Sequence, residues 1–423
     1  MTSQLVLGNG SGIVLASDSA ITIRGGRTFE SFEKVYGLPG PHRLAVMLSG
    51  NALYSRIPIE VLVKEWIRSL SDNVEASVED YREDFVSWIG NRADRWQSAS
   101  GREVAAWNSL VRELGNLTDW LKRNLDGAEE EESPADLVLA NLRRINEDDS
   151  TWSSIVSSSE AESIIDRWWE PDNTLLSPPG SPRPGLEKVV GDRFDGIPRS
   201  ETIDQEIRTY LRLVVEKAVN FPETGGRAHL IFVGYGVNDL LPTLARLDLY
   251  GGMGKKVWSE SHEPTLPRFA GASYALIQSA AQDETIDLIL FGYDRGLART
   301  GLSQALDSVL PFDQGPEETD LSDQGPEEAE SPSLANQRFR KELIEKHDEE
   351  MDALTRAEFF ERAMATVAVM PLLDLADAAK ALVAVQVLTL DIKGKLPSVG
   401  GHIDVASITP DEGFRWISHG KDG

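Results

Sequence analysis

The sequence contains no cysteine, which excludes disulfide bonds and thiolate metal ligands. Cysteine-based redox chemistry is therefore impossible, and a reducing compartment is consistent with the composition. The chain also lacks a run of about 18 apolar residues, the length that a membrane-spanning helix needs, and its first residues do not resemble a secretion signal. We expect a cytoplasmic protein that has no membrane partner.

Basic residues are scarce relative to acidic ones. Lys and Arg total 42 against 69 for Asp and Glu, so the formal net charge is −27. A surface of this sign repels the phosphates of nucleic acid, which we do not expect as a partner. The six histidines show neither the spacing of metal ligands nor a recognisable Ser-His-Asp set, so the sequence predicts no metal and no cofactor.

The chain is long enough for more than one domain. It has 423 residues, and 41% of them are hydrophobic, which is sufficient for a substantial buried core. These bulk properties leave the activity open, so the local patterns decide it.

The first fifty residues alternate short apolar segments with turns. Ser3–Leu7 and Ile13–Ser17 flank a glycine-rich turn and are predicted to form a β-hairpin in which Thr2 begins an edge strand. Thr28–Tyr36 is rich in aromatic and β-branched residues, and Leu44–Leu48 follows a Pro/Gly turn. The sequence therefore predicts a meander of four strands.

Thr2 follows the initiator methionine directly. Once Met1 is removed, the residue carries both a hydroxyl nucleophile and a free α-amine that can act as its general base. Asp18 and Lys34 follow at equal intervals along the chain. Many proteins begin with Met-Thr for unrelated reasons, and Asp18 and Lys34 could form only a structural ion pair, so the three positions have to be considered together.

The spacing of Thr2, Asp18 and Lys34, with apolar strands between them, resembles the N-terminal part of proteasome-type β subunits, which are N-terminal-nucleophile hydrolases. The resemblance implies that these three residues are catalytic. It also implies that Gly50 supplies a backbone N–H to an oxyanion hole and that the backbone at Thr22 lines the substrate cleft.

The sequence departs from this family at positions expected around the α-amine. The family has a serine at the entry to a core helix, where this chain has Gly271, and an aspartate and a serine before a Gly-Gly pair, where it has Leu396 and Val399. Ser273 and Ser398 are the nearby serines that could take over these roles.

The resemblance implies an α+β fold, a four-layer αββα sandwich of two antiparallel sheets with an inserted helical subdomain. The hydrolase-like core would comprise residues 1–70, 227–282 and 360–423. Residues 71–226 are predicted to form the helical insertion, and residues 283–359 an acidic, partly disordered insertion with a charged helix.

Three helices are expected to cover the sheets: Ala52–Leu70, with Asn51 as its N-cap, Ala270–Ala281 and Leu373–Leu390. Further strands are predicted as two pairs, one at His229–Gly236 and Pro242–Leu249 and one at Ser398–Ile408 and Phe414–Ile417.

Two loops are predicted within the insertions. The proline-rich segment Ser177–Gly185 is expected to be a linker. The acidic repeats Asp313–Glu318 and Asp323–Glu328 have too few apolar residues to compensate for the entropy of ordering them, so they are expected to be disordered.

Together these patterns predict a threonine-type peptidase or amidohydrolase that cleaves peptide or other amide bonds through an acyl-enzyme on Thr2, with a peptide or protein as substrate. Two alternatives remain open. An amine could resolve the acyl-enzyme, which would make the protein a transpeptidase, or the chain could be an inactive scaffold that binds a partner through its helical insertion. A homo-oligomer or ring, as in the family, is also expected unless the insertion blocks it.

Overall fold

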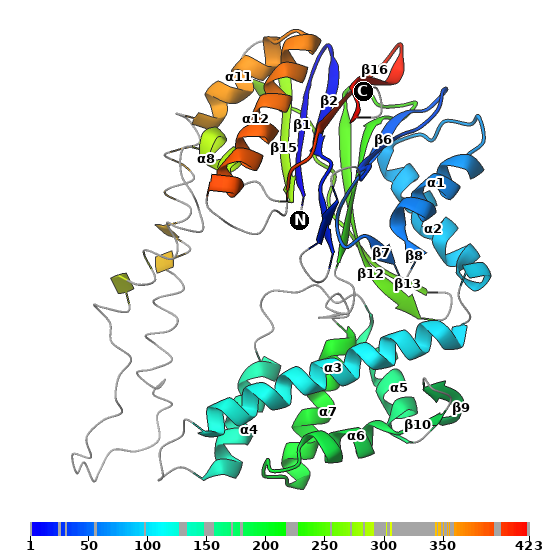
Figure 1. Ribbon diagram of the computed structural model, residues 1–423, viewed down its shortest axis with the longest axis vertical. Helices are drawn as coiled ribbons and strands as arrows, with labels where there is room; N and C mark the ends of the chain where they lie inside the picture. Colours follow the sequence, from blue (N-terminus) through cyan, green and yellow to red (C-terminus); the bar gives the residue numbers. More distant parts are fainter. Residues whose placement is uncertain are drawn as a thin grey trace, which may run out of the picture. The chain divides into compact units, whose positions relative to one another are not determined.

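The computed structural model describes residues 2–23, 27–29, 32–54, 57–96, 99–126, 133–147, 156–170, 172–177, 181–216, 227–253, 256–270, 273–281, 284–291, 359–392 and 399–420, with a few positions between 302 and 355. The fold is mixed α and β, and its sheets are antiparallel (Figure 1). The chain divides into two compact units. Unit 1 comprises Met1–Phe32, Pro267–Thr409 and Arg415–Gly423, and unit 2 comprises Glu33–Leu266 and Pro410–Phe414.

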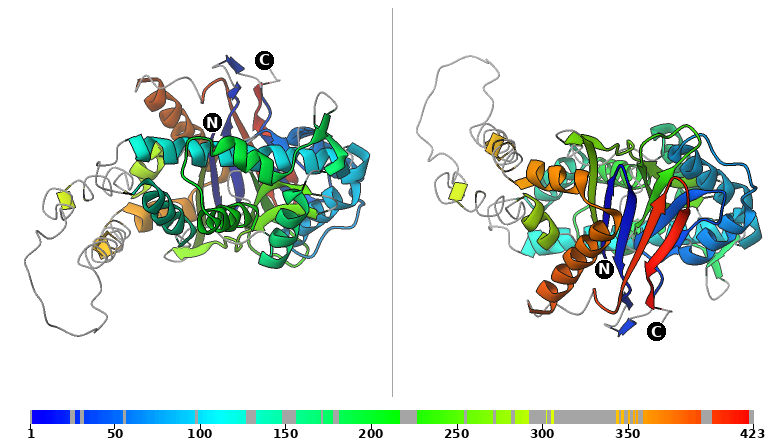
Figure 2. Two further views of the ribbon diagram at one scale, coloured as in Figure 1. Left: turned by 90° about the horizontal axis from the view of Figure 1, so that it is seen from below. Right: turned by 90° about the horizontal axis from the view of Figure 1, so that it is seen from above.

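Unit 1 is built on a six-stranded sheet of order β14-β15-β1-β2-β16-β17. Its strands are β1 (Ser3–Asn9), β2 (Gly12–Asp18), β14 (Arg268–Ala270), β15 (Ser273–Ala281), β16 (Ile403–Thr409) and β17 (Gly413–Ser418). The right-hand view of Figure 2 shows the β1–β2 hairpin beside the C-terminal strands. The predicted hairpin is confirmed. The prediction that Thr2 begins an edge strand is wrong, because β1 pairs with β15 on one side and β2 on the other.

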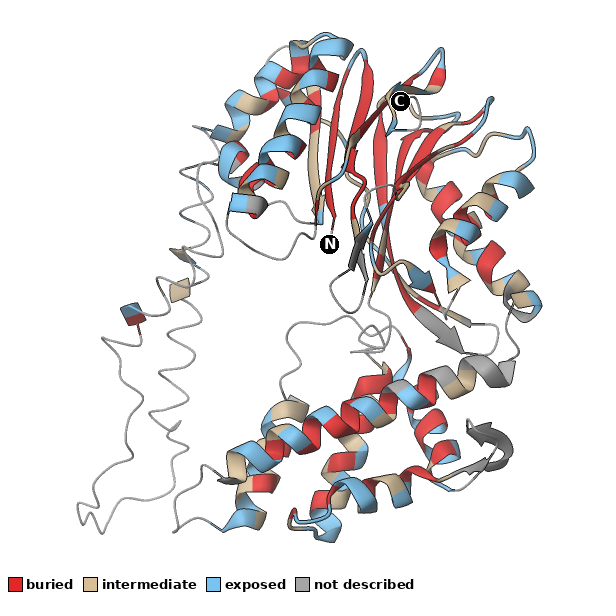
Figure 3. Ribbon diagram, in the orientation of Figure 1, coloured by how far each residue is buried: buried red, intermediate tan, exposed pale blue. Residues whose placement is uncertain are grey.

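Helices cover a face of this sheet. They are α8 (Glu284–Phe291), α11 (Glu361–Val369) and α12 (Leu372–Ile392), and α12 confirms the helix expected at Leu373–Leu390. Leu5 and Val14 of the hairpin belong to one buried apolar cluster with Leu375 and Ala379 of α12. Both strands of the hairpin are buried (Figure 3). Burying a leucine or valine side chain stabilises the unit by about 1.5–3 kcal/mol.

The segment Ala270–Ala281 is not a helix. It ends β14 and continues as β15, which pairs with β1 from Ser3 opposite Ala281 to Gly8 opposite Leu276. A short, alanine-rich apolar run fits either element by its pattern alone. The decisive factor is the partner strand β1, which satisfies the backbone hydrogen bonds of β15.

Unit 2 contains a five-stranded sheet of order β13-β12-β11-β6-β5. Its strands are β5 (Val35–Gly37), β6 (Arg43–Gly50), β11 (Ala228–Tyr235), β12 (Thr243–Met253) and β13 (Lys256–Ser261). The predicted pairing of the β11 and β12 segments is confirmed. The predicted four-stranded meander is wrong, because β1 and β2 lie in one sheet and β5 and β6 in another.

Three two-stranded ribbons complete the strands. They are β3 (Ile21–Ile23) with β4 (Arg27–Phe29), β7 (Leu53–Tyr54) with β8 (Ile57–Pro58), and β9 (Asp172–Ser177) with β10 (Ser181–Arg183). The β9–β10 pair contradicts the linker predicted at Ser177–Gly185, because Ser177 ends β9 and Ser181–Arg183 forms β10, which pairs with it.

Two helices, α1 (Ile59–Ser69) and α2 (Val78–Trp96), pack on the sheet of unit 2. Trp66 of α1, Phe85 of α2 and Phe232 of β11 form a cluster with ring centroids 5.2–5.8 Å apart. The helix expected at Ala52–Leu70 is α1, which begins at Ile59 and so later than predicted. Its N-cap is Pro58 and not Asn51, because proline has no N–H and is tolerated only at the start of a helix.

The range 71–226 also holds α3 (Ala99–Asp126), α4 (Pro134–Glu147), α5 (Ser158–Trp169), α6 (Leu186–Arg193) and α7 (Glu201–Glu216), which confirms the predicted helices. Trp107 and Trp168 are buried in their common core, and Tyr250 and Trp258 of β12 and β13 join it. The acidic repeats lie outside the described residues. Among the described helices, none is long and apolar enough to cross a membrane.

Candidate active site

Thr2 lies immediately before β1 and is buried. The register of the β1–β2 hairpin, in which Gln4 faces Ser17, places Asp18 next to Ser3. The Ser3 N–H donates a hydrogen bond of 2.8 Å to Asp18 Oδ1. A carboxylate at the end of β2 therefore holds the backbone of the residue that follows the predicted nucleophile.

Asp18 also fixes a second segment of unit 1. Its side chain is completely buried, and its Oδ2 accepts a hydrogen bond of 3.0 Å from the Gly400 N–H. The Ser19 N–H returns hydrogen bonds to the carbonyls of Gly400 (3.2 Å) and His402 (3.1 Å). Charge-assisted hydrogen bonds of this kind orient a carboxylate strongly. Asp18 thus links the start of β1 to the segment that leads into β16.

Ser19, next to Asp18, belongs to a Ser-His-Asp arrangement. The sequence did not predict this arrangement. The Ser19 hydroxyl lies 3.2 Å from His402 Nδ1, and His402 Nε2 lies 3.1 Å from Asp404 Oδ1. Asp404 is buried and also accepts the Gly420 N–H at 3.0 Å. Ser19 is inaccessible to solvent, so this hydroxyl cannot meet a substrate and the arrangement orients the end of β2. The available signal was the two-residue spacing of His402 and Asp404, which puts both on one face of an extended segment.

Lys34 and Gly50, the predicted catalytic lysine and oxyanion-hole glycine, belong to unit 2. Lys34 precedes β5 and is buried, with 3% of its surface exposed, and its carbonyl accepts the Leu48 N–H at 2.8 Å. Gly50 ends β6 with φ +75°. A Cβ at this position would lie 2.3 Å from the carbonyl oxygen of Arg227, so the backbone here requires glycine.

The other predicted site residues are Thr22, Ser273 and Ser398. Thr22 lies in β3 opposite Thr28. Ser273 begins β15, whereas the residue opposite Ser3 is Ala281, at the other end of that strand. Eight residues of strand correspond to about 27 Å, so Ser273 does not lie beside Thr2. Ser398 lies outside the described residues.

Ala281 has an unusual backbone conformation. Its φ is +69°, in the left-handed region that residues other than glycine seldom adopt. Such outliers persist only where the surrounding structure enforces them, and they are concentrated at functional sites. This one lies directly across the sheet from Ser3.

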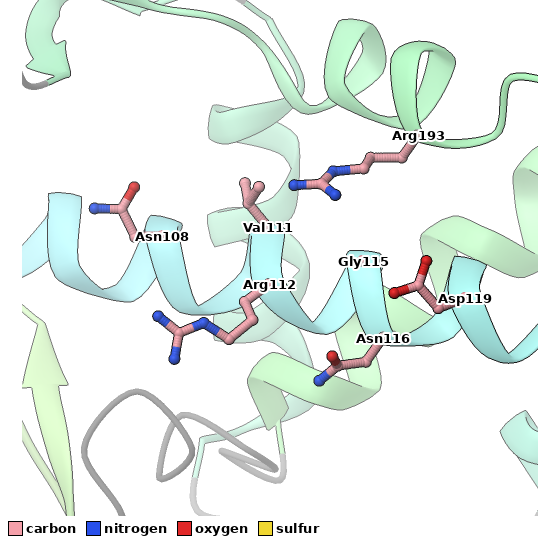
Figure 4. Close-up of a pocket in the computed structure, with 7 residues that line it drawn as sticks. All are labelled: Asn108, Val111, Arg112, Gly115, Asn116, Asp119 and Arg193. Atoms are coloured by element: carbon pink, nitrogen blue, oxygen red, sulfur yellow. The ribbon is translucent and has the colours of Figure 1, made fainter. Parts of the chain in front are cut away.

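The structure also has a groove in the helical part of unit 2, with a volume of about 330 Å³. It is lined by Asn108, Val111, Arg112, Gly115, Asn116, Asp119 and Arg193 (Figure 4). The lining is polar and carries charges of both signs, and it contains none of the residues that the sequence predicted to be catalytic.

The geometry within unit 1 is therefore that of a buried carboxylate that fixes the residue after Thr2 and the Gly-Gly segment. Lys34 and a conformationally restricted Gly50 belong to unit 2. No protein-family model matches the chain, and a search of curated proteins finds no match either.

Proposed function

We propose that the protein is a threonine-type N-terminal hydrolase that cleaves peptide or other amide bonds through an acyl-enzyme on Thr2. The observation that carries the proposal is the environment of Asp18. This fully buried carboxylate binds the N–H of Ser3, the residue after Thr2, and the N–H of Gly400. A carboxylate so deeply buried is costly unless it has a specific role or complete hydrogen bonding.

The mechanism begins with removal of Met1. The Thr2 hydroxyl then attacks the amide carbonyl while its α-amine, with a reference pKa of about 7.7–8.0, accepts the proton. Lys34 favours the ionised hydroxyl through its positive charge, and the Gly50 N–H stabilises the oxyanion. The roles of Lys34 and Gly50 follow from the resemblance of the sequence alone. The protonated α-amine then donates that proton to the leaving amine as the C–N bond breaks, and water hydrolyses the Thr2 ester, which releases the acid and regenerates the hydroxyl.

The proposal includes the fold of this hydrolase family, the four-layer αββα sandwich. It is supported by the two antiparallel sheets, because each unit contributes one and carries helices against it. A homo-oligomer or ring and a cytoplasmic location belong to the same proposal, and the lack of cysteine is consistent with the latter.

A scaffold without activity is the second candidate. It is favoured by the position of Ser273, which lies at the end of β15 away from Ser3, whereas Ala281 is the residue opposite Ser3. Among the described residues, Ser273 therefore does not supply the serine that the family has beside the α-amine. Transpeptidation shares the acyl-enzyme with hydrolysis and differs only in the group that resolves it.

The decisive experiment is intact-protein mass spectrometry before and after treatment with an electrophile directed at N-terminal threonine, such as a β-lactone or an epoxyketone. We expect loss of Met1 and addition of one inhibitor to Thr2. Thr2→Ala should not react, whereas Thr366→Ala, which removes an exposed threonine hydroxyl of α11, should react normally.

A chain that keeps Met1, or a Thr2→Ala variant that is labelled like the wild type, would overturn the hydrolase and favour the scaffold. If labelling occurs, peptides supplied with and without an added amine acceptor distinguish hydrolysis from transpeptidation through the mass of the product.

A further inference from the structure

Three neighbouring strands of unit 2 carry ionisable side chains in one row. His229 of β11 lies directly opposite Asp248 of β12, and Asp248 lies directly opposite Glu260 of β13. Residues opposite one another in a sheet project from the same face. His262 follows two residues after Glu260, so it extends from that face as well.

The side chains converge on a single point. One ligand atom from each of Asp248, Glu260 and His262 lies within 4.8 Å of the other two. His262 Nε2 is 3.2 Å from Asp248 Oδ2. Two ligands of one tetrahedral zinc ion, with bonds of about 2.1 Å, are separated by about 3.4 Å. The spacing of these two atoms is thus close to that of ligands that share an ion.

Hydrogen bonds orient both carboxylates, as they do in metal sites. His229 Nδ1 lies 2.6 Å from Asp248 Oδ1, which leaves Oδ2 directed towards His262. The buried Tyr250 donates its hydroxyl to Glu260 Oε2 at 2.8 Å. Arg82 of α2 donates to the carbonyl of His262 at 2.7 Å and so fixes its backbone. Supporting contacts of this type raise the affinity of a site by fixing its ligands.

A network without an ion is the alternative to consider. Arg227 Nη1 lies 3.2 Å from Asp248 Oδ2, and with the two histidines it could satisfy that carboxylate. Burial alone would raise the pKa of Asp248, but the hydrogen bonds and charges of His229 and His262 outweigh it, so the pKa lies below its usual value. An ionised carboxylate suits either an ion pair or a metal. Glu260 adds a second carboxylate to the cluster, and a divalent ion between the two carboxylates would reduce their mutual repulsion more than the single charge of Arg227 does.

We propose that Asp248, Glu260 and His262 bind a divalent transition-metal ion of the Zn²⁺ type. One imidazole nitrogen and two carboxylate oxygens suit ions of intermediate softness, and three protein ligands leave a position for water. The sequence did not predict this metal site. Asp248 lies in β12, Glu260 lies in β13 and His262 directly follows β13, so the three ligands do not form a recognised spacing along the chain.

The experiment is isothermal titration calorimetry of the full chain, stripped with a chelator, against zinc chloride. We expect one ion per chain. Glu260→Gln and His262→Gln should each weaken binding at least tenfold. Glu263→Gln, which removes the same charge from an exposed neighbour, should bind as the wild type does.

Thermal unfolding with and without zinc accompanies the titration, since a ligand that binds only the folded state raises Tm. If a variant does not fold, the visible spectrum of the cobalt(II)-loaded wild type decides. Strong absorption bands indicate a tetrahedral N/O site and support the proposal. Absence of binding by the wild type, or equal binding by Glu260→Gln and His262→Gln, would overturn it.

Discussion

At the scale of single residues, Asp18 is the most constrained group of the candidate site. It accepts two backbone N–H groups that come from distant parts of the chain, and it does so without contact with water. Its geometry can therefore be tested apart from the proposed chemistry.

Asp18→Asn should lower the free energy of unfolding by about 1–3 kcal/mol. Asparagine can accept only one of the two N–H groups with its single oxygen, and its NH₂ group then faces the other donor. Urea denaturation measures the loss. Asp377→Asn, at an exposed position of α12, provides the matched control and should change little. An Asp18→Asn protein as stable as the wild type would contradict the hydrogen bonds to Ser3 and Gly400.

Gly50→Ala should destabilise the protein by at least about 2 kcal/mol. The cost combines a positive φ with a Cβ placed 2.3 Å from the Arg227 carbonyl oxygen. Gly191→Ala, within α6, makes the same chemical change and should be neutral or stabilising by up to about 1 kcal/mol. Equal effects of the two substitutions in thermal unfolding would show that the backbone at Gly50 is not restricted.

At the scale of elements, the local patterns of the sequence predicted some elements correctly, and the long-range strand pairing did not follow from them. The β1–β2 hairpin and α12 could be predicted because a glycine-rich turn and a long apolar run determine each of them locally. β15 could not, since its strand conformation depends on β1, far away in the sequence. The pairing of His402 with Ser19 was hidden for the same reason.

The junction between β1 and α11 offers a test at this scale. Asn9 Nδ2 donates hydrogen bonds of 2.7 Å to the carbonyls of both Val367 and Met370, and the side chain is buried. Asn9→Ala should cost about 2–3 kcal/mol because both bonds are lost. Hydrogen exchange should show α11 opening more readily. Asn73→Ala, at an exposed position, serves as the control. Unchanged protection of α11 would mean that Asn9 does not anchor it.

At the scale of the molecule, titration in alkali should report on the packing of unit 2. Burial, the largest cause for each, raises the pKa of Tyr36, Tyr81 and Tyr250. A raised pKa in the folded state contributes stability that is present below the unfolded pKa of about 10 and is lost as pH rises above it. We therefore expect unfolding at a pH above 10, driven by ionisation of these tyrosines in the unfolded chain.

Ultraviolet absorbance of tyrosinate, followed together with circular dichroism, measures this effect. Tyrosinate absorbance should rise in two phases, and the second phase, which includes Tyr36, Tyr81 and Tyr250, should coincide with unfolding. Tyr36→Phe should make stability decline less steeply above pH 10. A single ionisation phase that precedes unfolding would refute the prediction.

The hydrogen bond between Gly400 and Asp18 spans 382 residues, and this separation determines when the N-terminal strand can acquire its native surroundings. At about 5–20 residues per second, a ribosome needs roughly 20–75 s to synthesise the chain between these two residues. β16 is not completed during that interval, and β15 is incomplete for most of it. The hairpin therefore cannot pair on both sides until the end of synthesis is near. The β1–β2 hairpin of the nascent chain is thus accessible before Asp18 is enclosed, and the buried surroundings of Asp18 form only after nearly the whole chain has been made.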